Sequence, residues 1–309
     1  MYKKFEKILC SVCSSNEFEK ISEKGHLNIP IYVSICKKCG LVFLNPRWTK
    51  KEYADYYHDK YDKWLREIIE EIPDKLKYLK PATAFKRITP YLSKKNLKIL
   101  DIGAGMGWHS YYFKKKYKNI SLSAIESSLR CSNYLKKNGF KILTSDIDSN
   151  WHIENKNNFN LIILRMTLEH LLNPVSALQK ISDSLSNNGI LYISVPNMMI
   201  PKMKGSLENH WFRAEHTYYF SKTTLLSMVS KANLKPIFIN SDTSELWGIF
   251  KGGGFDFKFN SVYEEQINAI KKFRKKYLIN YIINYIPRKI KSILPDKIKQ
   301  KLKIILKNA

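Results

Sequence analysis

The chain lacks the features that place a protein across a membrane or outside the cell. It contains no uninterrupted apolar run long enough to span a bilayer, and its first residues carry no apolar core followed by a cleavage site. Cysteine is scarce, with 5 in 309 residues, which argues against a disulfide-stapled secreted scaffold. We therefore expect a cytoplasmic globular protein, with a peripheral position at the inner membrane surface as an alternative.

Acidic residues are scarce as well. The chain has 27 Asp and Glu against 53 Lys and Arg, which gives a formal net charge of +26. Such an excess favours an anionic partner, either a nucleic acid or an anionic membrane. Solvated surface lysines in a lysine-rich composition explain the charge nearly as well. The excess is strong near the end of the sequence, because residues 258–309 hold 14 Lys and Arg against 3 Asp and Glu.

What the chain does contain is a glycine-rich loop directly after a hydrophobic strand. Gly103 and Gly105 follow the apolar run 97–102, and a helix-like segment begins at Trp108. Glycine lets the backbone turn tightly and approach a ligand, and a helix N-terminus offers free N–H groups. The dinucleotide fingerprint requires a third glycine where Trp108 stands, which disfavours NAD.

Two acids stand at the ends of the next two predicted strands. Glu126 lies 19 residues after Gly107, the distance at which an acid can bind both hydroxyls of a ribose. Asp146 follows the third strand, where it can accept a hydrogen bond from an adenine amino group or cap the next turn. Together with the glycine loop, these acids predict a pocket for a nucleotide-type cofactor.

Strands and helices alternate through the middle of the chain, which predicts an α/β fold with a doubly wound, mostly parallel, Rossmann-like sheet. The expected strands are 97–102, 121–126, 141–144, 160–164 and 189–195, and the expected helices are 108–118, 129–137 and 174–185. A further helix is expected at 223–232, and segments 236–240 and 247–250 are expected to be two closing strands, with an antiparallel pair as one arrangement.

The order of these segments along the whole chain suggests four parts. We predict a zinc-binding module (1–48), a helical linker or lid (49–95), the domain with the glycine loop (96–250) and a basic helical tail (251–309). Tyr53, Tyr57 and Tyr61 stand four residues apart on one face of the linker. That stripe either packs on the next domain or covers a pocket.

Two Cys-x-x-Cys pairs occupy the first part. They are Cys10 with Cys13 and Cys36 with Cys39, separated by 22 residues. Thiolates at this spacing can face one metal, and two pairs complete a tetrahedral site for Zn²⁺. All four positions are then filled by protein, so the zinc is expected to be structural, and a module with so little core would need it to fold.

At these residues the chain resembles the class I S-adenosylmethionine-dependent methyltransferases. The segment 100–107 is similar to the first motif of that family, and the resemblance extends over residues 97–250. It implies S-adenosylmethionine as cofactor. The implied ligands are Asp101, Gly103 and Gly105 for the amino-acid end, Glu126 for the ribose and Asp146 for the adenine. The join 39–47 also resembles a zinc-binding N-terminus found on one methyltransferase group, several of whose members methylate nucleotide-linked sugars.

Two Glu-His pairs are candidates for the general base that a hydroxyl or carbon acceptor requires. Glu169-His170 follows the fourth strand, and Glu215-His216 lies in a polar and aromatic loop. The segment 215–221 resembles one found in sugar C-methyltransferases, although Ala214 and Arg213 depart from its pattern. Arg165, at the end of the fourth strand, is a candidate for binding the carboxylate of the cofactor or an acidic substrate.

Two helices are expected in the basic tail, 263–285 and 295–307. Ile298, Leu302 and Ile305 share one face of the second helix, which lysines surround. Such a helix either packs on the protein or lies on an anionic membrane. The sequence as a whole therefore predicts a zinc-containing methyltransferase acting on a sugar or glycan, nucleotide-linked or lipid-linked. The alternatives are an RNA methyltransferase and a non-catalytic scaffold.

Overall fold

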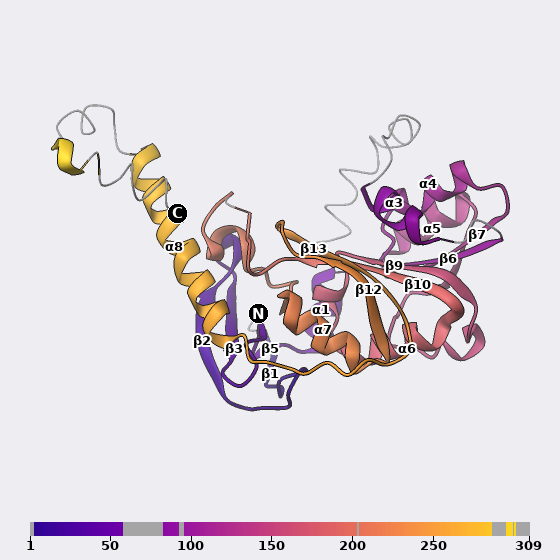
Figure 1. Ribbon diagram of the computed structural model, residues 1–309, viewed down its shortest axis with the longest axis horizontal. Coiled ribbons are helices and arrows are strands. Elements are labelled where there is room, and N and C mark those ends of the chain that lie inside the picture. Colours follow the sequence, from indigo (N-terminus) through magenta and orange to yellow (C-terminus); the bar gives the residue numbers. More distant parts are fainter. Residues whose placement is uncertain are drawn as a thin grey trace.

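A seven-stranded mixed sheet forms the larger part of the protein (Figure 1). The computed structural model describes residues 3–57, 83–92, 96–202, 204–285, 295–298 and 300. The strand order is β8-β7-β6-β9-β10-β13-β12, parallel from β8 to β10, with β13 antiparallel to both of its neighbours. The strands are β6 (Leu97–Ile102), β7 (Ile120–Ile125), β8 (Phe140–Thr144), β9 (Phe159–Arg165), β10 (Leu185–Pro196), β12 (Leu234–Asn240) and β13 (Glu245–Gly252).

The central strand β9 shows why the sheet is buried on both sides. Leu161 and Ile163 point into one core, whereas Ile162 and Leu164 point into the other, and all four are fully buried. A continuous apolar run is the expected pattern for a parallel strand covered on both faces. This part of the fold confirms the predicted α/β class, including an antiparallel pair at the edge.

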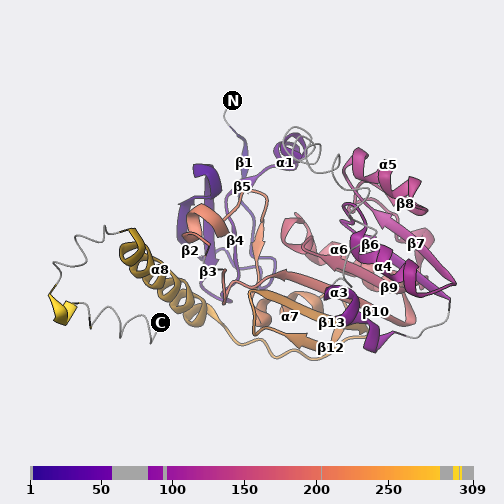
Figure 2. The ribbon, with the colours of Figure 1, turned by 90° about the horizontal axis from the view of Figure 1, so that it is seen from above.

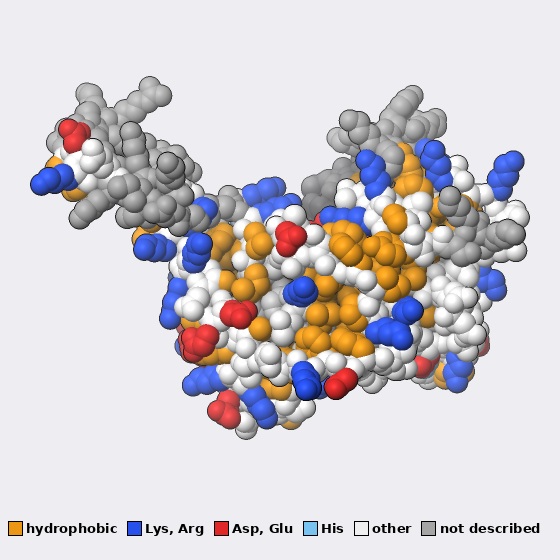
Figure 3. Space-filling view, viewed as in Figure 1, with side chains coloured by type: hydrophobic (Ala, Val, Ile, Leu, Met, Phe, Trp, Pro, Cys, Tyr) orange, Lys and Arg blue, Asp and Glu red, His pale blue; other side chains and the backbone are white. Residues whose placement is uncertain are grey.

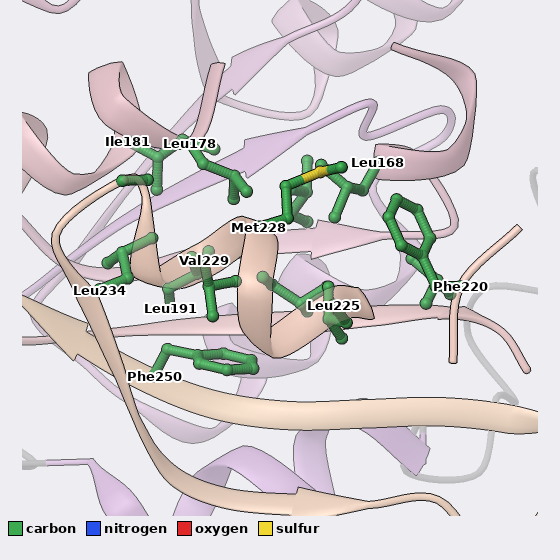
Figure 4. Packing of buried hydrophobic residues seen from close by; sticks show 14 of the residues in the cluster. Leu168, Leu178, Ile181, Leu191, Phe220, Leu225, Met228, Val229, Leu234 and Phe250 are labelled. Atoms are coloured by element: carbon green, nitrogen blue, oxygen red, sulfur yellow. The ribbon is translucent and has the colours of Figure 1, made fainter. Parts of the chain in front are cut away.

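Helices cover the two faces of the sheet. The first face carries α3 (Thr83–Ile88), α4 (Trp108–Lys116) and α5 (Leu129–Lys137), and the second carries α6 (Pro174–Ser184) and α7 (Lys222–Ser230). Figure 4 shows the second core, in which Leu225 and Val229 of α7 lie near Leu191 and Phe250 of the sheet, and Leu178 and Ile181 of α6 join the same cluster. The predicted helices are confirmed within a few residues at their ends.

The cysteine-rich part has a separate sheet, to which the larger domain contributes one strand. Its four-stranded sheet has the order β11-β4-β3-β2, from β2 (Phe18–Lys24), β3 (Pro30–Cys36), β4 (Val42–Leu44) and β11 (Tyr218–Tyr219). A two-stranded sheet joins β1 (Phe5–Glu6) to β5 (Arg47–Trp48). Because β11 comes from the segment before α7, the N-terminal module is built partly from residues far outside 1–48.

Helix α8 (Tyr263–Tyr285) has the bounds predicted for the first tail helix. Figures 1 and 2 show it lying along the N-terminal module, beside β2 and β3. Ile267, Ile270 and Phe273 are buried there, and Gln266 donates a hydrogen bond to the carbonyl oxygen of Gly40. The apolar face of α8 is thus covered by the protein itself.

Two predicted features fall largely on residues that the structure leaves undescribed. Helix α1 (Lys50–Tyr56) opens the predicted linker, but Tyr61 of the tyrosine stripe lies outside the described residues. In the predicted second tail helix, Leu302 and Ile305 lie outside them as well.

Within the described ranges, no helix is both long enough and apolar enough to cross a membrane. Lysine and arginine side chains are spread over the face shown in Figure 3, with apolar patches between them.

Candidate functional site

A cavity of about 310 Å³ opens at the carboxyl ends of the central parallel strands, where α1 covers it. Ligands of doubly wound sheets bind at this edge, near the point where the strand order reverses. Its lining residues include Lys50, Tyr53, Tyr57, Gly103, Glu126, Asp146, Asp148, Met166, Thr167, His170 and Leu172. The predicted pocket therefore lies at the predicted edge, with Tyr53 and Tyr57 in its wall.

Gly103 of the glycine loop lines the cavity, whereas Gly105 is not among its lining residues. Gly103 and Gly105 both have positive φ, +67° and +54°. A Cβ on Gly103 would lie 2.4 Å from Oγ1 of Thr167, whereas a Cβ on Gly105 would meet nothing within 4 Å. Gly103 is thus required by close packing, and Gly105 presents bare backbone to open space, which suits contact with a ligand.

Glu126 connects the glycine loop to the segment that follows β7 by hydrogen bonds. Its carboxylate accepts hydrogen bonds from the backbone N–H of Gly105 (2.7 Å) and of Ser128 (2.8 Å). The residue is 5% exposed and lines the cavity. It therefore holds the glycine loop in place, and it is the residue that the sequence predicts to bind the ribose.

Asp101 lies beneath the glycine loop and is not among the residues that line the cavity. It is buried and accepts a hydrogen bond from the hydroxyl of Ser110. Burial raises its pKa to about 7, with a smaller contribution from the negative charge of Glu126. The positive charge of Arg165 opposes that rise. Arg165 itself is half-buried at the end of β9 and does not line the cavity.

Asp146 stands at the far end of the cavity. One carboxylate oxygen accepts a 2.8 Å hydrogen bond from the backbone N–H of Asp148, so the residue caps its own turn. Nζ of Lys50, in α1, lies 3.5 Å from Oδ2 of Asp146 and 3.3 Å from Oδ2 of Asp148. These ion pairs connect the covering helix α1 to the residue expected to bind adenine.

Across the cavity, His170 contacts the second Glu-His pair. Its Nδ1 lies 2.8 Å from the carbonyl oxygen of Glu215 and 3.1 Å from the hydroxyl of Tyr57, and its ring centroid is 4.9 Å from that of His216. The carboxylate of Glu215 receives hydrogen bonds from Arg213 and Tyr56. Burial lowers the pKa of both histidines, so their imidazole rings are neutral at neutral pH. The three predicted catalytic residues thus form one cluster, of which His170 lines the cavity.

Glu169 completes this cluster, although the sequence singled it out only as the neighbour of His170. It is 1% exposed, and its carboxyl oxygens lie in the interior. Burial raises its pKa to about 8. No sequence signal distinguishes a buried glutamate from an exposed one at the end of a strand, so its burial emerges only from the fold.

The geometry above belongs to a recognised family. Residues 57–237, more than half of the chain, match the family described as a methyltransferase domain. The chain belongs to this methyltransferase family. It carries an S-adenosylmethionine-dependent methyltransferase domain, as the resemblance of segment 100–107 implied.

The relatives that match the chain are distant in sequence. It is 28% identical over 205 residues to ribosomal RNA small subunit methyltransferase C of Buchnera aphidicola, covering 62% of this chain and 57% of that protein. It is 28% identical over 102 residues to (S)-coclaurine N-methyltransferase of Papaver somniferum, covering 31% of this chain and 28% of that protein. A solved S-adenosylmethionine-dependent methyltransferase from Clostridium acetobutylicum has 14% identity and a TM-score of 0.44, covering 66% of this chain and 99% of that one.

A second centre lies in the N-terminal module of the protein. The sulfur atoms of Cys10 and Cys39 are 3.4 Å apart, and those of Cys13 and Cys36 are 3.5 Å apart. All four sulfurs lie within 4.8 Å of one another. Sulfurs bound to one zinc at 2.3 Å in tetrahedral geometry lie roughly 3.8 Å apart. The four cysteines therefore have the arrangement of a metal site, and the donor set fits zinc.

This cysteine centre is connected to the cavity through Tyr218 and Arg47. The hydroxyl of Tyr218, in β11, is 2.8 Å from Oγ of Ser11, which stands between Cys10 and Cys13. Arg47 donates to the same hydroxyl and to the carbonyl oxygen of Leu172, which lines the cavity. Sequence reasoning missed these contacts because their partners lie more than a hundred residues apart.

Proposed function

We propose that the protein transfers the methyl group of S-adenosylmethionine to a sugar or glycan acceptor. The observation that carries the proposal is the cavity into which the glycine loop, Glu126 and His170 all face. A cofactor-binding loop and a basic side chain then share one space. Such sharing lets the enzyme align the acceptor with the methyl group, which supplies much of the acceleration in a displacement.

For a hydroxyl acceptor the chemistry is a single in-line displacement. The bond between the cofactor sulfur and the methyl carbon breaks as the bond from that carbon to the acceptor oxygen forms. The hydroxyl proton passes to a general base, and the products are a methyl ether and S-adenosylhomocysteine. The Glu-His cluster of His170, Glu215 and His216 supplies the base in this proposal.

The cavity wall supports a sugar as the acceptor class. Tyr53 and Tyr57 provide aromatic faces, and Lys50 and Asp148 provide polar atoms beside them. Aromatic rings pack against the C–H face of a sugar, and a few polar groups fix the orientation of its hydroxyls. The likeness of segment 215–221 to sugar C-methyltransferases points the same way.

The four cysteines hold a structural zinc ion in this proposal. Cys10, Cys13, Cys36 and Cys39 would all be thiolate ligands, which leaves no position for substrate. When bound, zinc supplies folding free energy to the module and takes no part in methyl transfer.

Cofactor binding is the first test of the proposal. Isothermal titration calorimetry with S-adenosylmethionine and S-adenosylhomocysteine is expected to give one site per chain with micromolar affinity. Nucleotide sugars would then be screened as acceptors by mass spectrometry for a gain of one methyl group. A folded protein that binds neither cofactor form would refute the methyltransferase proposal, and transfer to RNA alone would refute the sugar.

RNA is a second candidate acceptor, favoured by one relative and by the charge. The Buchnera protein is a ribosomal RNA methyltransferase, and this chain carries a net charge of +26. An RNA substrate predicts that affinity falls steeply with salt, since each neutralised phosphate releases counterions. Filter binding of ribosomal RNA fragments between 50 mM and 200 mM salt, with roughly a thousandfold loss expected, separates this candidate from the sugar.

A further inference from the structure

Next to His170, one oxygen of a buried carboxyl group has no hydrogen-bond partner among the described residues. Glu169 follows β9, is 1% exposed and has an Oε2 atom that is buried and meets no hydrogen-bond partner among the described residues. A buried carboxylate oxygen costs free energy unless a donor or a cation meets it. Glu169 therefore requires an explanation that the methyl-transfer proposal does not provide.

Two imidazoles stand next to this carboxylate. Nε2 of His170 is 4.0 Å from Oε1 of Glu169, and the ring of His216 meets the ring of His170 edge to face. Each of the three residues offers one ligand atom within 4.8 Å of the other two. A carboxylate and two imidazoles are a common ligand set for divalent first-row metals.

The orientation of His170 fits the role of a metal ligand. The carbonyl oxygen of Glu215, 2.8 Å from Nδ1, can only accept a hydrogen bond, which assigns the ring proton to Nδ1. The lone pair then lies on Nε2, the nitrogen beside Glu169. Histidines that bind metals usually donate their other N–H to a carbonyl or carboxylate in this way, which fixes tautomer and ring direction.

We propose that Glu169, His170 and His216 bind one divalent transition-metal ion, separate from the cysteine centre. The mixed nitrogen and oxygen set suits Mn²⁺, Fe²⁺, Co²⁺, Ni²⁺ or Zn²⁺ rather than Ca²⁺ or Mg²⁺. Ligand atoms about 2.0–2.2 Å from an ion lie roughly 3–3.5 Å apart. The 4.0 Å separation between Glu169 and His170 must therefore shorten by up to roughly 1 Å, which rotation of the side chains provides.

This site gives the ion a role that rests on the proposed methyl transfer. Three protein ligands leave coordination positions of the ion open. Because His170 lines the cavity, these open positions lie toward the cavity. An acceptor hydroxyl bound there loses its proton more readily, as metal-bound water does. The oxygen gains the methyl carbon as the sulfur loses it, and the released proton passes to the carboxylate of Glu215. The two histidines then act through the ion and not as bases.

Manganese binding tests the site directly. The protein holding one equivalent of Zn²⁺, which fills the four-thiolate site first, is titrated with Mn²⁺, and the free Mn²⁺ is followed by electron paramagnetic resonance. One Mn²⁺ per chain is expected. Glu169→Gln, which keeps the size of the side chain, and His216→Asn are each expected to weaken binding at least tenfold. His210→Gln, a change in the same segment but outside the cluster, is expected to leave it unchanged.

The outcomes separate the metal site from the proposed function. Absence of a second metal, or binding that both cluster variants leave intact, would overturn the metal site. Methyl transfer that proceeds equally with and without added Mn²⁺ would overturn the role of the ion while leaving the methyltransferase proposal standing. Saturable Mn²⁺ binding without transfer to any sugar would support the metal site and refute the sugar. Calorimetry with S-adenosylhomocysteine on each variant shows that the fold and the cofactor cavity are intact.

Discussion

At the scale of single residues, Glu126 has the sharpest expected effect. Its two carboxylate oxygens accept hydrogen bonds from the backbone N–H groups of Gly105 and Ser128. In Glu126→Gln one of these oxygens is replaced by an NH₂ group, which cannot accept the hydrogen bond. A hydrogen bond to a charged group contributes about 1.5–3 kcal/mol, so S-adenosylhomocysteine binding should weaken by about tenfold to a hundredfold. Calorimetry measures the change, and the exposed Glu154→Gln is the control. Equal affinity in the Glu126→Gln variant and the wild-type protein would remove Glu126 from the cofactor site.

Asp101 is expected to make stability depend on pH. Burial raises its pKa from 3.8 to about 7, so between these values the folded state binds the proton more tightly than the unfolded state. Its contribution to stability is therefore present below about pH 4 and is lost as the pH rises through about 7. Asp101→Asn removes this titration. In urea unfolding, wild type should lose free energy of unfolding relative to the variant between pH 5 and 8.

A matched substitution tests whether that loss belongs to Asp101. Asp242→Asn alters an exposed carboxylate in the turn between β12 and β13, and its free energy of unfolding should follow wild type at both pH values. If the Asp101→Asn variant also ran parallel to wild type, Asp101 would not be the titrating group.

At the scale of elements, local signals predicted more than long-range ones. The strands β6 and β9 and the glycine loop could be predicted because apolar runs and turn residues are local patterns. The meeting of His170 with His216 could not, since it depends on where β9 ends and on how the chain returns toward β11. The two-residue strand β11 carries no signal of its own, because its partner β4 lies far away in the sequence.

The cysteine centre provides a test at this scale. Cys36→Ser removes one of the four ligands at the end of β3, so we expect loss of bound zinc and a lower melting temperature. The free energy of binding structural zinc contributes to the free energy of folding, so zinc and folded structure should be lost together. Cys131→Ser, a buried thiol in α5 outside the cluster, should keep the zinc. Zinc content by atomic absorption decides the matter, and an unchanged metal content in Cys36→Ser would contradict the site.

At the scale of the whole molecule, the N-terminal module and the methyltransferase domain share one hydrophobic core. Val33 and Leu44 of the module share a core with Phe212, from the segment before β11, and with Ile270 of α8. The β4–β11 pairing and the Arg47 contacts add backbone and side-chain links across the same boundary. Removal of residues 1–48 would therefore expose the apolar side of α8 and leave β11 without a partner strand.

This unity predicts that ligand binding at one end stabilises the metal site at the other. A ligand that binds only the folded state raises its stability by mass action, by about 2.7 kcal/mol at a hundred times its Kd. If the protein unfolds as one unit, saturating S-adenosylhomocysteine must raise the temperature of zinc release as much as that of helix loss. Zinc release is followed with a colorimetric chelator, and helix loss by circular dichroism at 222 nm. Zinc release at an unchanged temperature, while helix loss shifts upward, would show that the module opens independently of the methyltransferase domain.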